Sequence, residues 1–422
     1  MTIELRPHQQ KAVDAIVSGF AMSKTKAKPI IAQAPTAFGK SYVIAELARR
    51  YNSSLILAPT KEIVEQNYDK LIAAGIPRSQ IGICSASVGS HNTNRVTIGT
   101  IGTVKKFVSS VKDSEVIIID ENDNCPIERS NSEYVSFLNQ LNSNKIVGLT
   151  ASPWRNLVVK RQFEDPKVFC RPLTRIVMTD GDKTRFGKWF WSGGMVYRCG
   201  IKELQDGGFL SKINYITQAT DWSFLDRALG RVDYDEQELG LWANLDGNQE
   251  IFKRAVEWAS KEFKRTLVFA PNIYASQKLC EMTRQMGISC ETIDSLNDTK
   301  KSREAKLKRF REGKTQILFN VAILTAGYDL PSLDCVIMCR ATKSLRLYVQ
   351  SIGRAIRIDP DNPNKVAQVI DMAGNLGRFG KVEDIIMTQV DAVSAQGWKY
   401  KKDVIAYRPL GSAKYKILDR IS

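Results

Sequence analysis

The amino-acid sequence predicts an α/β protein built from two halves, each with a parallel β-sheet. Short apolar runs alternate with helix-like segments, and polar clusters follow many of these runs directly, as in parallel strands joined by helices. The pattern occurs twice along 422 residues, which is enough chain for two or three separate cores. We expect a first lobe at 1–157, an insertion at 158–198, a second lobe at 199–378 with a helical excursion near 221–248, and a basic tail at 379–422.

The composition favours a polyanionic partner. The chain has 61 Lys and Arg against 45 Asp and Glu, a net charge of +16, although a merely basic surface is the alternative. Eight cysteines stand singly and only two histidines occur, which argues against a zinc ribbon, a disulfide framework or a His-based hydrolase. No apolar run approaches the ~20 residues of a membrane span, and the first residues lack a signal-peptide core. We therefore expect a location in the cytosol.

The segment Pro29 to Ser41 is the centre of the first lobe. An apolar run ends at Pro35, and Gly39, Lys40 and Ser41 open a helix-like segment. In such a loop backbone N–H groups face phosphate oxygens, a Lys reaches the β- and γ-phosphates, and a Ser hydroxyl holds Mg²⁺. The loop lacks the first glycine of the usual pattern. We expect it to bind ATP and Mg²⁺ through Thr36, Gly39, Lys40 and Ser41.

A second cluster supplies acidic groups. The segment from Glu115 to Glu121 reads as a buried strand that ends in two acids. Asp120 is expected to join the Mg²⁺ shell, and Glu121 to orient or deprotonate the attacking water. The alternative is a pair of acids that merely starts a turn.

Further strands of the first half are expected at 54–58, 95–98 and 145–149, and each precedes a polar cluster. Because ligands gather at the carboxyl ends of parallel strands, these clusters are expected to form one site. Thr60 is predicted to cap the helix that follows the first of these strands. The amide of Gln9 suits the two hydrogen-bonding edges of adenine.

These motifs occur in the order found in superfamily 2 helicases, and the chain resembles the DExD form of that family. The resemblance implies two RecA-like lobes that hold ATP and Mg²⁺. It also implies that Asp123 couples the nucleotide site to Thr150 and Ser152, although an N-cap is the alternative for Asp123. Further implied contacts are those of Arg6 and Gln9 with the nucleotide, and of Thr60, Lys61, Gly99 and Thr100 with a nucleic-acid backbone.

The second half continues the resemblance. Residues 320–331 resemble the fifth helicase motif and 350–357 the sixth. Arg354 and Arg357, one helical turn apart, are expected to face the same way and to stabilise the leaving phosphoryl group, with a surface salt bridge as the alternative. The motifs further imply Gln350 as catalytic, Gly327 and Asp329 as nucleotide contacts, and Asn320 and Thr325 as nucleic-acid contacts. Strands are expected at 212–217, 266–270, 316–321, 335–339 and 366–371, and a charged, solvated helix at 298–313.

Within the superfamily, four segments look most like RadD-type DNA repair helicases and phage branch-migration helicases. They are residues 5–10, 325–329, 350–357 and 371–375. This subgroup implies DNA as the partner, roles in replication, recombination or repair, and a location in the cytosol of a bacterium or of a phage-infected host.

The insertion interleaves basic residues with aromatic ones. Trp189, Phe190 and Trp191 lie in a stretch, 183–194, that ends in glycines. Such a stretch suits an exposed loop that stacks on a base or wedges between strands. Packing of the rings onto a lobe is an equally good interpretation.

The sequence therefore predicts an ATP-dependent DNA helicase or translocase that remodels forked or branched DNA, with a monomer favoured. Contacts to the nucleic-acid backbone would make binding sequence-independent and salt-sensitive. The alternatives are an RNA-directed motor and an ATP-gated nucleic-acid clamp. A restriction-enzyme motor subunit is a further alternative, although no nuclease-like cluster of acids and Lys is evident.

Overall fold

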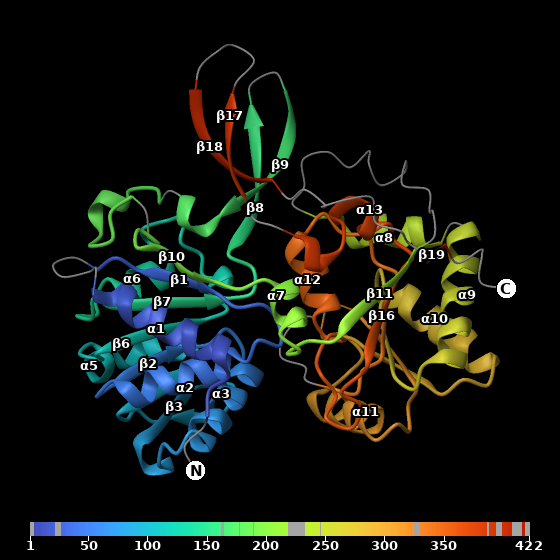
Figure 1. Ribbon diagram of the computed structural model, residues 1–422, viewed down its shortest axis with the longest axis horizontal. Helices are drawn as coiled ribbons and strands as arrows, with labels where there is room; N and C mark the ends of the chain where they lie inside the picture. Colours follow the sequence, from blue (N-terminus) through green and yellow to red (C-terminus); the bar gives the residue numbers. More distant parts are fainter. Residues whose placement is uncertain are drawn as a thin grey trace. The chain divides into compact units, whose positions relative to one another are not determined.

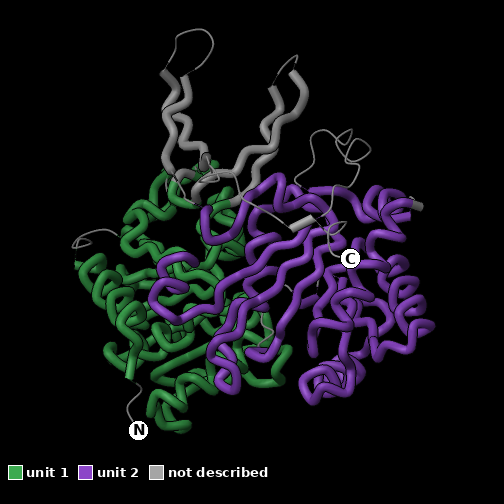
Figure 2. Tube along the Cα trace, turned by 45° about the vertical axis from the view of Figure 1, so that its right-hand side comes forward, with its two compact units in different colours: residues 1–155, 170–200, 390–405 green, residues 156–169, 201–389, 406–422 purple. Residues whose placement is uncertain are grey.

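A computed structural model gives the fold of the chain (Figure 1). It divides into two compact units (Figure 2): unit 1 comprises residues 1–155, 170–200 and 390–405, and unit 2 comprises 156–169, 201–389 and 406–422. The residues that the structure describes are 4–21, 27–161, 164–176, 178–188, 190–217, 233–244, 246–321, 323–324, 330–385, 388–393, 399–406 and 416–417.

Unit 1 contains an eight-stranded sheet in the order β10-β1-β7-β6-β2-β5-β3-β4, parallel except between β3 and β4. The five strands predicted for the first half are confirmed to within one residue at each end. The strands are β1 (Ile30–Gln33), β2 (Ser54–Leu57), β3 (Ile81–Ser85), β4 (Ser90–His91), β5 (Val96–Gly99), β6 (Val116–Asp120), β7 (Lys145–Thr150) and β10 (Gly194–Arg198). The helices are α1 (Pro7–Ala21), α2 (Lys40–Arg50), α3 (Lys61–Ala73), α4 (Ile101–Val104), α5 (Val108–Val111) and α6 (Glu133–Leu138).

Helices cover both faces of this sheet. The helices α1, α2 and α3 pack against one another and against β1, β3 and β5 (Figure 1). On the other face, Val135 and Leu138 of α6 join Leu55 and Ile117 of the strands in one buried cluster. Strands buried on both faces explain the continuous apolar runs in the sequence.

The segment expected as a separate arm between the lobes is largely part of unit 1. Strand β10 pairs in parallel with β1, with Gly194 opposite Ile30, and residues 170–200 belong to this unit. Phe186, Phe190 and Trp191 lie in the buried cluster of unit 1. The expected boundary at 158–198 is therefore wrong, because backbone pairing and apolar burial tie most of the segment to the first sheet.

Trp191 is buried and is unavailable to stack on a base. Its side chain is 1% exposed, and its ring meets that of Phe190 edge-on with centroids 4.9 Å apart. A Cβ added at Gly148 of β7 would overlap both Trp191 and Asn122, so these two side chains share the space above that glycine. The packing interpretation thus holds for Trp191, whereas Trp189 lies outside the described residues.

Unit 2 contains a seven-stranded sheet in the order β13-β14-β12-β15-β16-β11-β19, in which every strand pair is parallel. The five strands predicted for this half are confirmed to within one residue at each end. The strands are β11 (Lys212–Thr217), β12 (Thr266–Phe269), β13 (Cys290–Ile293), β14 (Ile317–Asn320), β15 (Cys335–Met338), β16 (Val366–Asp371) and β19 (Lys416–Ile417). The helices are α7 (Ile201–Asp206), α8 (Glu236–Ala243), α9 (Asp246–Glu262), α10 (Ile273–Gln285), α11 (Lys300–Arg311), α12 (Leu345–Ile352) and α13 (Asn375–Phe379).

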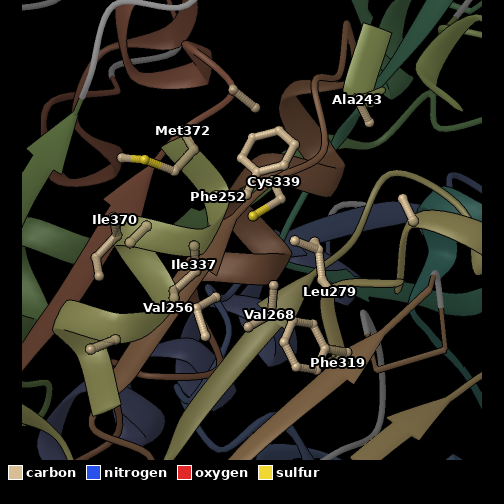
Figure 3. Packing of buried hydrophobic residues seen from close by; sticks show 14 of the residues in the cluster. Ala243, Phe252, Val256, Val268, Leu279, Phe319, Ile337, Cys339, Ile370 and Met372 are labelled. Carbon is tan, nitrogen blue, oxygen red and sulfur yellow. The ribbon is translucent and has the colours of Figure 1, made fainter. Parts of the chain in front are cut away.

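The core of unit 2 lies between its sheet and the helices α8, α9 and α10. Phe252 and Val256 of α9 and Leu279 of α10 meet Val268 and Ile337 of the strands (Figure 3). The helical excursion expected near 221–248 corresponds in its described part to α8, and α9 continues beyond it.

The charged helix α11 is a solvated face, as predicted. Thr299 caps its first turn by accepting a hydrogen bond from the Ser302 amide at 3.2 Å. Several of its cations already have acidic partners, because Lys306 pairs with Asp298 and Arg309 with Glu291. These ion pairs neutralise part of the positive charge of the helix.

Two further pairs of strands lie outside the large sheets. Strands β8 (Trp154–Arg161) and β9 (Glu164–Pro172) form one two-stranded sheet, and β17 (Thr388–Val393) and β18 (Lys399–Ala406) form another. The second lies in the tail, to which the sequence assigned no structure. Within the described residues, no helix is long and apolar enough to cross a membrane.

The burial of Trp191 leads to a stability prediction. Trp191→Ala should lower the free energy of unfolding by about 3–5 kcal/mol, because it removes a large buried side chain and leaves a cavity. Urea unfolding followed by far-ultraviolet circular dichroism measures this loss. Leu296→Ala, at a side chain that is 80% exposed, is the control and should change stability by less than about 0.5 kcal/mol. A Trp191→Ala variant that kept its stability but lost DNA binding would restore the role as a DNA wedge.

Candidate active site

The predicted phosphate loop lies at the carboxyl end of β1 and turns sharply into α2. The amide of Ala34 donates to the Thr150 carbonyl at 2.9 Å, which ties the loop to β7. Gly39 has φ +88°, and a Cβ there would overlap the Gln9 amide. Ala37 is also left-handed, with φ +68°, a conformation that costs a non-glycine residue free energy. The turn leaves Lys40 and Ser41 as the first two residues of α2, where backbone N–H groups have no helical partner.

Gln9 is hydrogen-bonded to this phosphate loop. Its Nε2 donates to the Phe38 carbonyl at 3.0 Å, and its Oε1 accepts from the Arg6 amide at 3.0 Å. His8 contacts the same carbonyl through Nε2 at 3.3 Å, and its own carbonyl accepts from the Tyr197 hydroxyl of β10 at 2.9 Å. Adenine recognition by Gln9 stays a prediction, and it would require these hydrogen bonds to be exchanged for contacts with the base.

Lys40 forms an ion pair with Glu121, with 2.8 Å between Nζ and Oε1. Both side chains are largely buried, 12% and 17% exposed. Burial lowers the pKa of Lys40, but the negative charges of Glu121, Asp120 and Asp123 outweigh it, so the net shift of this pKa is upward. Lys40 is therefore a firmly held cation among acids, in the position from which it would turn to phosphate oxygens.

Asp120 ends β6 beside this ion pair. Burial and, to a smaller extent, the charge of Glu121 raise the pKa of Asp120. Its Oδ2 accepts a hydrogen bond from Asn67 Nδ2 of α3 at 2.8 Å. Asn67 belongs to no motif, but the sequence carries a signal for it, because it falls on the buried face of an amphipathic helix, between Val64 and Leu71. A polar side chain at such a core position needs a hydrogen-bond partner that is also buried.

Glu121 has a strained backbone and a partly engaged carboxylate. Its φ is +48°, in the left-handed region, immediately before a short 3-10 turn at Asn122–Asn124. Its Oε1 pairs with Lys40, whereas Oε2 is buried and has no hydrogen-bond partner among the described residues. An acceptor in this state can take a hydrogen bond from an attacking water.

The expected coupling residues meet at the ends of β6 and β7. The Thr150 hydroxyl donates to Asp123 Oδ1 at 2.7 Å, and the Ser152 amide donates to the Thr150 hydroxyl oxygen at 2.9 Å. All three side chains are at most 2% exposed. The structure thus brings them together, and their role in coupling stays a prediction.

The donor set fits Mg²⁺ bound together with phosphates. Within the described residues, no group of three or more His, Cys, Asp or Glu side chains could hold a metal by itself. Mg²⁺ typically uses one or two carboxylates and completes its octahedral shell with water and phosphate oxygens. Asp120 retains acceptor capacity beyond its hydrogen bonds to Asn67 and to the Glu121 amide. Asp120 and Ser41 would hold the ion, and its charge would stabilise the leaving phosphate.

The predicted nucleic-acid contacts of unit 1 lie at the ends of β2 and β5. Thr60 caps α3, as predicted, by accepting from the Ile63 amide at 3.4 Å, and Lys61 pairs with Glu65 at 3.2 Å. Gly99 is buried, and a Cβ there would overlap the Cys84 carbonyl, so glycine is needed for close packing of the strands. Thr100 is partly exposed beside it. Nothing in this geometry tests nucleic-acid binding, which stays a prediction.

The sixth motif of unit 2 departs from the expected helix. Helix α12 ends at Ile352, and Arg354 follows in a turn, with its amide donating to the Ser351 carbonyl at 3.3 Å. Arg357 pairs with Leu210 in an isolated bridge. The expectation that Arg354 and Arg357 share one helical face is wrong, because pairing with the segment before β11 pulls the chain out of the helix. Gln350 and Arg354 are 6% and 5% exposed.

The fifth motif is described only in part. Asn320 ends β14 and is fully buried, and its Oδ1 accepts from the amides of Ile323 and Leu324 at 3.0 and 2.9 Å. This geometry gives Asn320 a role in holding the turn. Thr325, Gly327 and Asp329 lie outside the described residues.

Two family models match this chain. Residues 2–155 match the res subunit of type III restriction enzymes, and residues 248–359 match the helicase conserved C-terminal domain. The chain belongs to the superfamily 2 helicases. Both matches fall where the structure has a parallel sheet, which agrees with two tandem RecA-like lobes.

Relatives and a solved structure agree with this assignment. A protein named as the ATP-dependent helicase IRC3 of Saccharomyces cerevisiae is 28% identical over 183 residues, covering 43% of this chain and 26% of IRC3. A 51.5 kDa protein of a Lactococcus phage is 24% identical over 356 residues, covering 82% of this chain and 66% of the phage protein. The type ISP restriction-modification enzyme LlaBIII, solved bound to DNA, superposes with a TM-score of 0.58 at 15% identity, covering 88% of this chain and 28% of LlaBIII. The chain thus spans between a quarter and two thirds of these proteins, and the last likeness concerns the fold alone.

The ion pair between Lys40 and Glu121 leads to a second prediction. Lys40→Ala, Glu121→Gln and the double variant should give a coupling energy of about 1–3 kcal/mol in chemical denaturation, because the two groups touch in a largely buried site. The pair of Lys61 with Glu65, whose carboxylate is 50% exposed, is the control and should give about 0.3–0.5 kcal/mol. Equal coupling in both pairs would contradict a buried, interacting site.

Proposed function

We propose that the chain is an ATP-dependent DNA helicase or translocase that remodels forked or branched DNA. The observation that carries the proposal is the site of unit 1, where Lys40 lies between the phosphate loop and the acids Asp120 and Glu121. A cation and a water-activating carboxylate at the carboxyl ends of β1 and β6, the two parallel strands that flank β7, suit hydrolysis of a nucleoside triphosphate. The net charge of +16 favours a nucleic acid as the partner that this hydrolysis moves.

Both units contribute residues to the proposed cycle of ATP hydrolysis. Unit 1 binds ATP through Thr36, Gly39, Lys40 and Ser41, and Glu121 accepts the proton of the attacking water. Arg354 and Arg357 of unit 2 stabilise the charge on the leaving phosphoryl group. Nucleotide binding then draws the units together and hydrolysis releases them, which moves a bound strand by one step.

Movement along duplex DNA without strand separation is the second candidate. Two findings favour it: the match of 2–155 to a restriction-enzyme subunit and the fold shared with LlaBIII. The burial of Trp191 also removes one ring of the wedge that unwinding would need. An RNA-directed motor and an ATP-gated clamp remain further alternatives, since backbone contacts do not distinguish DNA from RNA well.

Steady-state ATP hydrolysis tests the proposal. The purified chain should hydrolyse ATP slowly alone and at least tenfold faster with single-stranded, forked or four-way DNA, and less so with a matched RNA. Glu121→Gln should reduce turnover by about 10²-fold or more and keep nucleotide binding, because it removes only the proton acceptor. Greater stimulation by RNA would reassign the substrate, and an unaffected Glu121→Gln variant would overturn the assignment of the site.

Two displacement assays then separate unwinding from translocation. A helicase releases the complementary strand of a forked duplex, whereas a duplex translocase displaces a triplex-forming third strand and leaves the duplex intact. Release in the first assay supports remodelling of branched DNA. Displacement in the second alone supports the translocase, and stimulated ATP hydrolysis with neither would contradict both motors.

A further inference from the structure

Arg340 follows β15 at the carboxyl end of the unit 2 sheet. Its neighbours Cys339 and Ala341 belong to the buried cluster that packs against α8, α9 and α10 (Figure 3). Met338, the last residue of β15, points to the face opposite that cluster, because successive residues of a strand alternate, and Arg340 lies in a bend two residues beyond it. No motif that defines the proposed function includes this residue.

The backbone around Arg340 is held firmly. Asn375 of α13 donates through Nδ2 to the Arg340 carbonyl at 2.9 Å and accepts through Oδ1 from the Thr342 amide at 3.0 Å. The Thr342 hydroxyl donates to Asp233 at 2.7 Å, and Asp371 accepts from Asn375 Nδ2 at 3.2 Å. Such a loop fixes the starting point of the arginine side chain, which is the usual condition for precise recognition.

The guanidinium group of Arg340 is partly buried, but its buried nitrogens make no hydrogen bonds to the described residues. Its Nε and Nη1 are buried and have no hydrogen-bond partner among the described residues. Arg340 as a whole is partly exposed, so the group lies at the surface of the unit with two of its nitrogens turned inward. Burying a charged donor without a partner is costly, and arginine remains charged at any physiological pH.

A second buried donor lies at the same, carboxyl edge of the sheet. Asn320 Nδ2 has no hydrogen-bond partner among the described residues, although its Oδ1 is engaged. Ile317 and Phe319 of β14 belong to the cluster on one face of the sheet, so Asn320 projects from the opposite face, as Met338 does. Phe269 of β12 pairs with Asn320 on one side and with Met338 on the other, which places both donors near the carboxyl edge.

We propose that Arg340, together with the Asn320 amide, forms a phosphate-binding site of unit 2. Both groups present donors, which suits an anion, and the planar fork of a guanidinium matches two phosphate oxygens. The phosphate belongs either to the nucleotide or to the backbone of the nucleic acid. This inference rests on the proposed function, which supplies both ligands, and it adds Arg340, a residue outside the motifs, to Asn320 of the fifth motif.

The first test is stability without ligand. Arg340→Gln should leave the melting temperature unchanged or raise it, because it removes a buried charge that the fold does not pair. Arg309→Gln is the matched control and should lower it slightly, because Arg309 is paired with Glu291. A clear fall in the melting temperature of Arg340→Gln would mean that the fold itself holds the guanidinium, and would overturn the site.

The second test is binding. Affinity for AMP-PNP with Mg²⁺, and separately for a fluorescent 20-nucleotide oligothymidine at several salt concentrations, is measured for the full chain and for Arg340→Gln and Arg340→Lys. One affinity should fall about tenfold or more in Arg340→Gln, as expected for a lost charge-assisted hydrogen bond. Loss of AMP-PNP affinity assigns the nucleotide phosphate, whereas loss of oligothymidine affinity with a salt slope smaller by about one assigns the backbone. Arg340→Lys should be intermediate, because it keeps the charge and loses the fork.

The two proposals fail in different ways. If the wild-type chain binds both ligands and Arg340→Gln binds them equally well, the site is wrong and the proposed function stands. If the wild-type chain binds neither ligand, the proposed function is wrong and the site falls with it.

Discussion

The ion pair of Lys40 with Glu121 is the contact on which the candidate active site depends. It joins Lys40, the first residue of α2, to Glu121, which follows β6. Strand β7 pairs with both β1 and β6, and so it holds the loop that follows β1 close to the end of β6. A single cation facing Glu121, Asp120 and Asp123 stabilises a cluster of acids that would otherwise repel one another. The left-handed backbone at Ala37 and at Glu121 is the conformational cost of placing both groups at one edge of the sheet.

The sequence predicts the inner strands well and the edges poorly. Strands such as β6 (Val116–Asp120) and β2 (Ser54–Leu57) are buried along their whole length, so they read as continuous apolar runs. Among the strands of the two large sheets, it missed β3, β4, β10, β13 and β19. Gly194–Arg198 is partly exposed throughout, and Cys290–Ile293 lies at the edge of its sheet, so neither has a continuous apolar signature. Local patterns also could not reveal that Trp191 packs over Gly148, because that contact joins residues far apart in the chain.

The same contrast applies to the site. Lys40, Asp120, Asp123 and Thr150 could be found because each follows a recognisable strand, and the structure brings them together. The helical spacing of Arg354 and Arg357 misled the prediction, since a backbone bridge to Leu210 ends the regular structure early. Asn67 and Arg340 belong to no motif. They can be identified only from the hydrogen bonds that buried polar atoms make or lack, which requires the three-dimensional structure.

In the proposed cycle, nucleotide binding draws unit 1 and unit 2 together. Energy transfer between dyes on Lys112→Cys and Lys301→Cys tests it most directly, because both positions are exposed and the described cysteines of the native chain are buried. Transfer should increase when AMP-PNP and Mg²⁺ are added with DNA and should return to its starting value with ADP, and Lys40→Ala should abolish the increase. Unchanged transfer in the native chain, with AMP-PNP bound at saturation, would contradict the account.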